Sequence, residues 1–205
     1  MSETVFFDLE TGGIDKNLHP IIQIAAAAVD FRSDYMTPLR TFETKIQFDV
    51  SHTTPEALEK NSYDPAVWED QAVTADAARD AFSSFLREYS SVRMVSKRGK
   101  KYKVAQLIGH NASSFDFPFL QKWYENRGFL PASFSVWDTC QRARWAFAER
   151  PELIKPESNS LSDLAEYFNI TFDAHDAMED VLATIKVVSA LRRMESVRPL
   201  DFPTD

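Results

Sequence analysis

The first fifty residues carry the hydrophobic patterns of three β-strands. Residues 4–7 form an apolar run followed by polar residues and by Gly12-Gly13, which predicts a buried strand that ends in a turn. The apolar run 21–31 follows a proline and a short loop and predicts a second strand, although its consecutive alanines are weak strand formers. Residues 40–48 alternate between the two faces of a strand, which predicts a third one.

Helical spacing dominates the remainder of the chain. Apolar residues recur every three or four positions, which predicts helices over residues 74–89, 115–126, 139–148, 160–168 and 176–195, with a short helix over 56–60. The expected caps are Thr74, Ser113 or Ser114, and Ser160. Segment 51–73 is otherwise polar and irregular. We expect a hairpin with strands over 92–95 and 102–108, and a short strand over 134–137. Strands first and helices mostly later favour an α/β domain with a mixed sheet.

Length and composition set the organisation that we expect. The chain has 205 residues, enough for one domain over residues 1–197, with 198–205 as a loosely held C-terminal tail. Its single cysteine, Cys140, excludes an internal disulfide and favours a reducing, cytoplasmic compartment. No apolar run approaches the roughly 18–20 residues of a membrane span, and no secretory signal is visible, so we expect no membrane association.

Net charge gives two opposing indications about the substrate. The formal net charge is −8, whereas nucleic-acid-binding proteins usually carry a basic surface. A soluble acidic enzyme that acts on a small substrate is therefore one interpretation. Some of the carboxylates are, however, candidate metal ligands, and two bound divalent cations would halve the net charge and can make the local field positive. The acidic composition weakens the case for a nucleic-acid substrate without excluding it.

The first candidate site lies at the end of the predicted N-terminal strand. Asp8 and Glu10 are two residues apart, so on a strand their carboxylates point to the same face. This is the end at which α/β sheets usually bind ligands. Two adjacent carboxylates repel each other unless a proton or a cation lies between them, and Gly12-Gly13 would let a substrate approach the backbone closely. An exposed acidic strand end followed by a glycine turn explains this motif, taken alone, equally well.

Two further acidic motifs lie at the starts of predicted helices. Asp116 falls in the first turn of one helix, where the helix dipole favours an aspartate, so capping alone explains it. The segment from His175 to Asp180 opens the last helix. A solvated helix N-terminus explains the three acidic residues of that segment but not His175. Each motif thus has a structural explanation on its own, and their combination is less easily accidental.

Together, the three motifs resemble those of the DnaQ-like DEDDh 3′→5′ exonucleases, a family that includes polymerase proofreading subunits, ribonuclease T and oligoribonucleases. The family pattern is D-x-E-T, then F-D, then H-x-x-x-x-D, and the matching positions are Asp8, Glu10, Asp116, His175 and Asp180. The resemblance covers about residues 4–190. It implies a ribonuclease H-like α/β fold, in which a central mixed β-sheet is flanked by helices. Asp176 and Ser62 depart from the residues common in the family.

The resemblance also implies a mechanism. Asp8 would bridge two divalent cations, Mg²⁺ or Mn²⁺, and Glu10, Asp116 and Asp180 would complete their ligands. Because histidine titrates near neutral pH, His175 would act as the general base that activates the attacking water. The reaction implied is hydrolysis of phosphodiester bonds with release of nucleoside 5′-monophosphates.

The implied substrate is DNA or RNA with a free 3′ end, expected to be single-stranded. Thr11 and Gly12 are expected to hold the terminal nucleotide. One basic run lies at the predicted hairpin, and its members are Lys97, Arg98, Lys100, Lys101 and Lys103. This run can follow a phosphate backbone, although a solvated turn that discourages aggregation explains it nearly as well. A polymerase partner or a homodimer is also compatible with the family.

Two other functions remain open on the sequence. A phosphatase of the haloacid-dehalogenase type would use Asp8 as its nucleophile, but it requires aspartate rather than glutamate at position 10, and a lysine and second acidic pair that are not found. The other alternative is a catalytically silent nucleic-acid-binding or polymerase-associated module on the same fold. The intact set of five matching positions argues against it.

Overall fold

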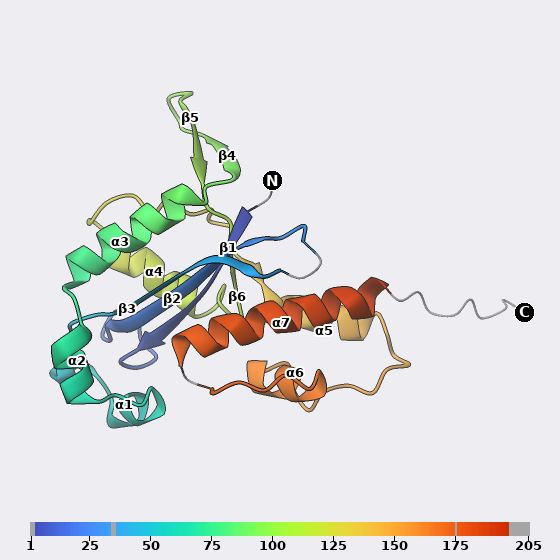
Figure 1. The fold of residues 1–205 in the computed structure, drawn as a ribbon. Coiled ribbons are helices and arrows are strands. Elements are labelled where there is room, and N and C mark those ends of the chain that lie inside the picture. The colour runs from blue at the N-terminus through green and yellow to red at the C-terminus, as the bar shows by residue number, and fades with distance from the viewer. Residues whose placement is uncertain (1–2, 34–35, 175, 197–205) are drawn as a thin grey trace, which may run out of the picture.

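The computed structural model describes residues 3–33, 36–174 and 176–196, and it shows a mixed five-stranded sheet between helices (Figure 1). The strand order is β3-β2-β1-β6-β7. The strands are β1 (Glu3–Thr11), β2 (Ile21–Asp30), β3 (Pro38–Lys45), β6 (Leu107–Gly109) and β7 (Trp137–Asp138). β1, β2 and β3 pair antiparallel, whereas β6 is parallel to β1 and β7 to β6. The predicted α/β fold with a central mixed sheet is confirmed.

Helices cover both faces of the sheet. α7 (Ala177–Ser196) lies across one face, where Val181 packs with Phe6 of β1. α3 (Ala75–Glu88) and α4 (Asp116–Tyr124) cover the other face, where Phe82 and Leu120 belong to a larger core. This arrangement matches the predicted helical segments 74–89, 115–126 and 176–195 to within a few residues.

β2 is buried on both faces, which explains its alanines. Ala25 and Ala27 belong to the core beneath α7, and Ala26 and Ala28 to the core on the other face. All four are fully buried. A strand covered on both sides has a continuous apolar run rather than an alternating one, so burial outweighs the low strand propensity of alanine here.

One helix lies in the segment that was predicted to be irregular. α2 (Pro65–Gln71) begins after Asp64, whose carboxylate accepts a hydrogen bond from the N–H of Ala66. Proline in the first turn leaves no helical hydrogen bond unmade. The prediction was wrong because these start residues specify a helix that is too short to show clear periodicity.

Two further predictions need correction. The predicted hairpin strand 102–108 is divided, because β5 (Lys101–Val104) pairs with β4 (Val92–Val95) while β6 joins the main sheet. The expected serine cap of α4 is absent: Phe115 occupies the cap position, and the hydroxyl of Ser113 donates instead to Asp138 Oδ2 at 2.6 Å.

The remaining described elements lie outside the strands of the sheet. They are the short turn η1 (Val50–His52), α1 (Pro55–Lys60), α5 (Thr139–Ala148) and α6 (Leu161–Tyr167). None of the described helices is both long and apolar enough to cross a membrane. The predicted tail 198–205 and the domain boundary at 197 lie outside the described residues.

Candidate active site

β1 places two carboxylates on the face of the sheet that α7 covers. Asp8 and Glu10 alternate with core residues such as Leu9, which lies in the opposite core. Because β6 is shorter than β1, the backbone of Leu9 extends beyond their pairing. Asp116 occupies this position, and its Oδ1 accepts a hydrogen bond of 3.1 Å from the N–H of Leu9. The first turn of α4 is thereby tied to the end of β1.

Asp180, in the first turn of α7, completes a cluster with Asp8 and Glu10. Carboxylate oxygens of these three residues lie within 4.8 Å of one another. Asp116 borders the cluster and is itself buried. The structure therefore brings together four carboxylates from the three sequence motifs. They line one cleft of about 560 Å³ at the C-terminal ends of β1 and β6.

Burial and mutual repulsion raise the pKa values of these carboxyl groups. Burial and, next in size, the charge of Asp180 raise the pKa of Glu10 to about 8. Burial raises the pKa of Asp116 to about 7, although hydrogen bonds from its own N–H and from that of Leu9 lower it. The pKa of Asp8 is raised well above its ordinary value, first by burial and then by Asp116 and Glu10. The site therefore favours bound protons or cations at neutral pH.

Lys60 is a cleft residue that the sequence analysis missed. It lines the cleft from the end of α1, and its positive charge lowers the pKa of Asp8 and of Glu10 against the larger effect of burial. The next residue, Asn61, holds α1 in place, because its buried Nδ2 donates to the carbonyl of Thr11 at 2.9 Å. The start of α1 is visible in the sequence, but no local pattern directs its last residue toward the carboxylates.

The glycine turn after β1 has a packing reason. Thr11 and Gly13 line the cleft, and Thr11 Oγ1 donates to the carbonyl of Gly13 at 2.8 Å. Gly12 lies between neighbouring loops, where a Cβ atom would come within 2.7 Å of Thr53 Cγ2 and 3.0 Å of Pro20 Cδ. Close packing of the loops therefore explains Gly12. The contacts of Thr11 and Gly12 with a terminal nucleotide stay predictions.

His110 connects three segments beside the cleft. Its Nε2 lies 2.9 Å from the carbonyl of Asn159, which can only accept, so Nε2 bears the proton. Nδ1 then accepts from the hydroxyl of Thr139 at 2.8 Å. Burial lowers the pKa of His110, which favours this neutral form. His110 thereby holds the segment that leads into α6, whose cap residue Ser160 and first-turn residue Ser162 line the cleft.

The start of α7 separates the roles of its acidic residues. Asp176 is exposed, and its Oδ1 accepts hydrogen bonds from two backbone N–H groups of the first turn, at 3.1 and 3.0 Å. This is helix capping, as considered for the whole segment. Asp180 belongs to the cluster instead. His175 lies outside the described residues, so its role as general base stays a prediction, while its neighbour Ala174 lines the cleft.

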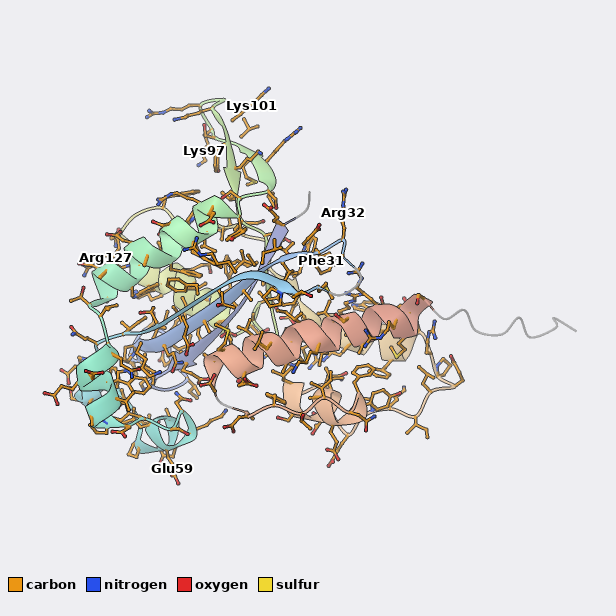
Figure 2. The ribbon with its side chains drawn as sticks, viewed as in Figure 1. Phe31, Arg32, Glu59, Lys97, Lys101 and Arg127 are labelled. Atoms are coloured by element: carbon orange, nitrogen blue, oxygen red, sulfur yellow. The ribbon has the colours of Figure 1, made fainter. Side chains whose placement is uncertain are left out.

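The basic hairpin lies away from the cleft. β5 leads into the N-terminal end of β6, whereas the carboxylates lie at the C-terminal ends of β6 and β1. Figure 2 shows Lys97 and Lys101 projecting from the far end of the hairpin, beyond the sheet. The predicted contacts Lys97, Arg98, Lys100 and Lys101 are therefore at the opposite end of the sheet from the carboxylates. Their contact with substrate stays a prediction and concerns long strands alone.

Known proteins resemble the chain in sequence and in fold. The ribonuclease T family model, described as exonuclease, matches residues 5–188. The chain is 29% identical over 192 residues to exonuclease DPD1, chloroplastic/mitochondrial, of Arabidopsis thaliana, covering 90% of this chain and 54% of the relative. It is 27% identical over 191 residues to ribonuclease T of Shewanella frigidimarina, covering 89% of this chain and 79% of the relative.

Solved structures show the same architecture. E. coli exonuclease I in complex with a dT13 oligonucleotide superposes with a TM-score of 0.77 at 22% identity, covering 95% of this chain and 42% of that chain. This similarity shows the fold. The chain spans about half the length of the Arabidopsis relative and less than half of exonuclease I.

Proposed function

Because the chain belongs to the DnaQ-like DEDDh exonuclease family, we propose that it is a 3′→5′ exonuclease acting on a nucleic-acid strand with a free 3′ end. One observation supports this most directly. Asp8, Glu10, Asp116 and Asp180 come from three separate parts of the chain and converge in one cleft, where burial and mutual repulsion favour bound protons or cations.

The four carboxylates would hold two divalent cations. Bound there, a pair of cations supplies electrostatic stabilisation of the attacking and leaving oxygens of a phosphodiester. The oxygen-only ligand set suits Mg²⁺ or Mn²⁺. The raised pKa values of Glu10 and Asp116 support this role, because binding sites for multivalent cations concentrate negative charge that is unfavourable without them.

Other residues would position the reacting groups. His175 would accept the proton of the attacking water, and the placement of Ala174 on the cleft wall supports this. Phe115, half-buried on the same wall, offers an aromatic face to the terminal base. Lys60 would attract the phosphate toward the carboxylates from the α1 side.

A single-stranded substrate is supported by the comparison structures. Exonuclease I was solved with a dT13 oligonucleotide, and the Shewanella relative is named as a ribonuclease. DNA and RNA strands are therefore both substrates to be assayed. The products would be nucleoside 5′-monophosphates.

The test is hydrolysis of labelled single-stranded DNA, duplex DNA and RNA, each with Mg²⁺ and with EDTA. We expect shortening from the 3′ end only with Mg²⁺, resistance of a 3′-blocked strand, and no influence of a 5′ label. Loss of a 3′-blocked strand from its 5′ end would refute the polarity. Hydrolysis of a small phosphomonoester instead would support the phosphatase, and strand binding without hydrolysis would support the catalytically silent module.

A further inference from the structure

A second hollow, of about 450 Å³, lies along the outer face of α4. One face of that helix lines it, through residues three or four positions apart: Pro118, Gln121, Lys122 and Glu125. Lys16 and Asn17, in the loop after β1, form another part of the lining. Phe129 and Phe134, in the segment after α4, form the third. We call this hollow the α4 groove.

The α4 groove adjoins the candidate active site. Ile14 lines the cleft and Lys16, two residues further along the same loop, lines the groove. In the same way, Phe115 lines the cleft and Pro118, about one helical turn further, lines the groove. The two hollows therefore lie close to each other on this loop and on the first turn of α4. A strand with its 3′ end at the carboxylates would have to cross only this short stretch to reach the groove.

Two aromatic rings that line the α4 groove are largely exposed. The Phe134 side chain is 70% exposed and that of Phe129 is 52% exposed. Phe129 is held in position by Tyr102, at 5.8 Å between ring centroids in an edge-to-face arrangement. Exposed rings of this kind provide stacking surfaces for unpaired bases, whatever their sequence.

The charge around the α4 groove is more basic than the chain as a whole. Lys16 and Lys122 line the groove, and Lys122 forms a 2.6 Å ion pair with Glu125. Arg127 lines an adjoining hollow together with both lysines and projects from the segment after α4 (Figure 2). These three cations outnumber Glu125 and the nearby Asp15, in a chain with a net charge of −8. Cations beside exposed rings fit a phosphate backbone that carries bases.

Resting on the proposed function, we propose that the α4 groove binds the single-stranded polynucleotide on the 5′ side of the cleaved nucleotide. α4 has 9 residues, which gives a length of about 13 Å. That length accommodates about four stacked nucleotides at roughly 3.4 Å each. Affinity should therefore rise with strand length to about six nucleotides, which includes the two at the scissile bond, and then level off.

The α4 groove does not continue onto the basic face of the hairpin. Tyr102, which contacts Phe129, lies between Lys101 and Lys103 on β5, and alternate residues of a strand point to opposite faces. The two lysines therefore point away from the ring contact. Variants of the groove and of the hairpin can be separated experimentally for this reason.

The test compares a dinucleotide with an octanucleotide as substrates of the Phe134→Ala variant and of the Phe129→Ala/Phe134→Ala double variant. For the octanucleotide, kcat/KM should fall by at least about five-fold, while that for the dinucleotide should change by less than about two-fold, because only the longer strand reaches the stacking surface. Trp145→Ala is the matched control, since this ring on α5 is 69% exposed and lies outside the α4 groove. It should change neither value.

Binding in EDTA separates this proposal from the proposed function. Fluorescence anisotropy of a labelled octanucleotide should show weaker binding to both phenylalanine variants than to the wild-type protein and to Trp145→Ala. If binding weakens in this way but the wild-type protein hydrolyses no strand with Mg²⁺, the proposed role of the groove stands and the proposed exonuclease activity is refuted. Three outcomes would each overturn the proposed role of the groove. The first is an active wild-type protein whose phenylalanine variants are unchanged, and the second is an equal loss of kcat/KM on both substrates. The third is that the wild-type protein does not bind the octanucleotide in EDTA.

Discussion

The two ends of the central sheet carry opposite charges in opposite surroundings. At the C-terminal ends of β1 and β6, Glu10 and Asp116 are buried, and burial raises their pKa values to about 8 and about 7. At the other end, the lysines of the hairpin are exposed to solvent. Buried charges interact strongly because the local dielectric is low, whereas exposed charges are screened within about 10 Å at 0.1 M salt. The difference supports the chemistry proposed for the acidic end and leaves the basic end suited to salt-dependent binding.

Replacing Asp8 should have the largest effect at the acidic end. In Asp8→Ala, hydrolysis should fall by about 10³-fold or more, because the predicted bridging ligand acts directly on the reacting charges. In EDTA, the Tm should be unchanged or higher, because one of the repelling carboxylates is gone. Activity assays and calorimetry check both, with Asp80→Ala, an exposed aspartate of α3, as the control. Full activity of Asp8→Ala would refute its assignment as a ligand.

His175→Ala tests the general base. Its kcat should fall by about 10²–10⁴-fold, the usual contribution of positioned proton transfer, and the wild-type rate should rise with pH through a histidine ionisation. Metal affinity measured by titration calorimetry should be nearly unchanged, because the carboxylates are the ligands. His52→Ala, at an exposed position, is the control. Parallel loss of metal would make His175 a ligand or a structural residue, and an unchanged rate would exclude the histidine-type mechanism.

The metal-free protein should lose stability as the pH rises from 6.5 toward 8. In the folded state, Glu10 and Asp116 hold protons up to pKa values of about 8 and about 7, whereas their ordinary values are 4.5 and 3.8. The folded state therefore binds more protons than the unfolded state in this window, and stability falls with pH. The lowered pKa of His110 has the opposite effect only below about its ordinary value of 6.5.

We expect the Tm in EDTA to fall by about 4 °C or more over this range, the shift that one to two kcal/mol produces in a chain of about this size. Saturating Mg²⁺ should remove the slope, and Glu10→Gln should reduce it in EDTA. A metal-free Tm that is constant or rises with pH would show that the carboxylates are ionised in the folded state without cations.

The Lys60→Met variant tests the single lysine at the acidic end, for comparison with the lysines of the hairpin. It should lower kcat/KM for a dinucleotide by about ten-fold, less than the loss of a fully buried electrostatic group, because Lys60 is exposed. Lys60→Arg should retain most of the activity, since it keeps the charge. An unchanged rate in Lys60→Met would show that this lysine contributes to the cleft only as a structural neighbour.

Reversing charge at the hairpin should have the smallest effect. Lys100→Glu/Lys101→Glu should weaken binding of a long strand by a few-fold at low salt and leave hydrolysis of a dinucleotide unchanged. Raising the salt concentration should remove the difference between variant and wild type. Equal effects on both substrates, or no effect on either, would show that the hairpin does not contact the strand.

Local patterns in the sequence predicted much of the scaffold and half of the acidic cluster. The helix predicted at 139–148 is α5, because residues that recur every three or four positions describe one face of a helix. Asp8 and Glu10 were predicted to share a face for the equivalent reason in a strand, and the structure shows them within one cluster. Such predictions succeed where the relevant neighbours lie within a few residues of each other along the chain.

Tertiary structure decided which distant residues meet. Asp116 hydrogen-bonds to the N–H of Leu9, 107 positions away, because β6 pairs with β1 and ends before it. Lys60 reaches the cleft through the contact of Asn61 with Thr11. Separation of the hairpin from the cleft likewise follows from dividing 102–108 between two sheets. Strand pairing sets the first and third of these, and a side-chain hydrogen bond between distant residues sets the second. All three depend on partners remote in the sequence, so no local pattern contains them.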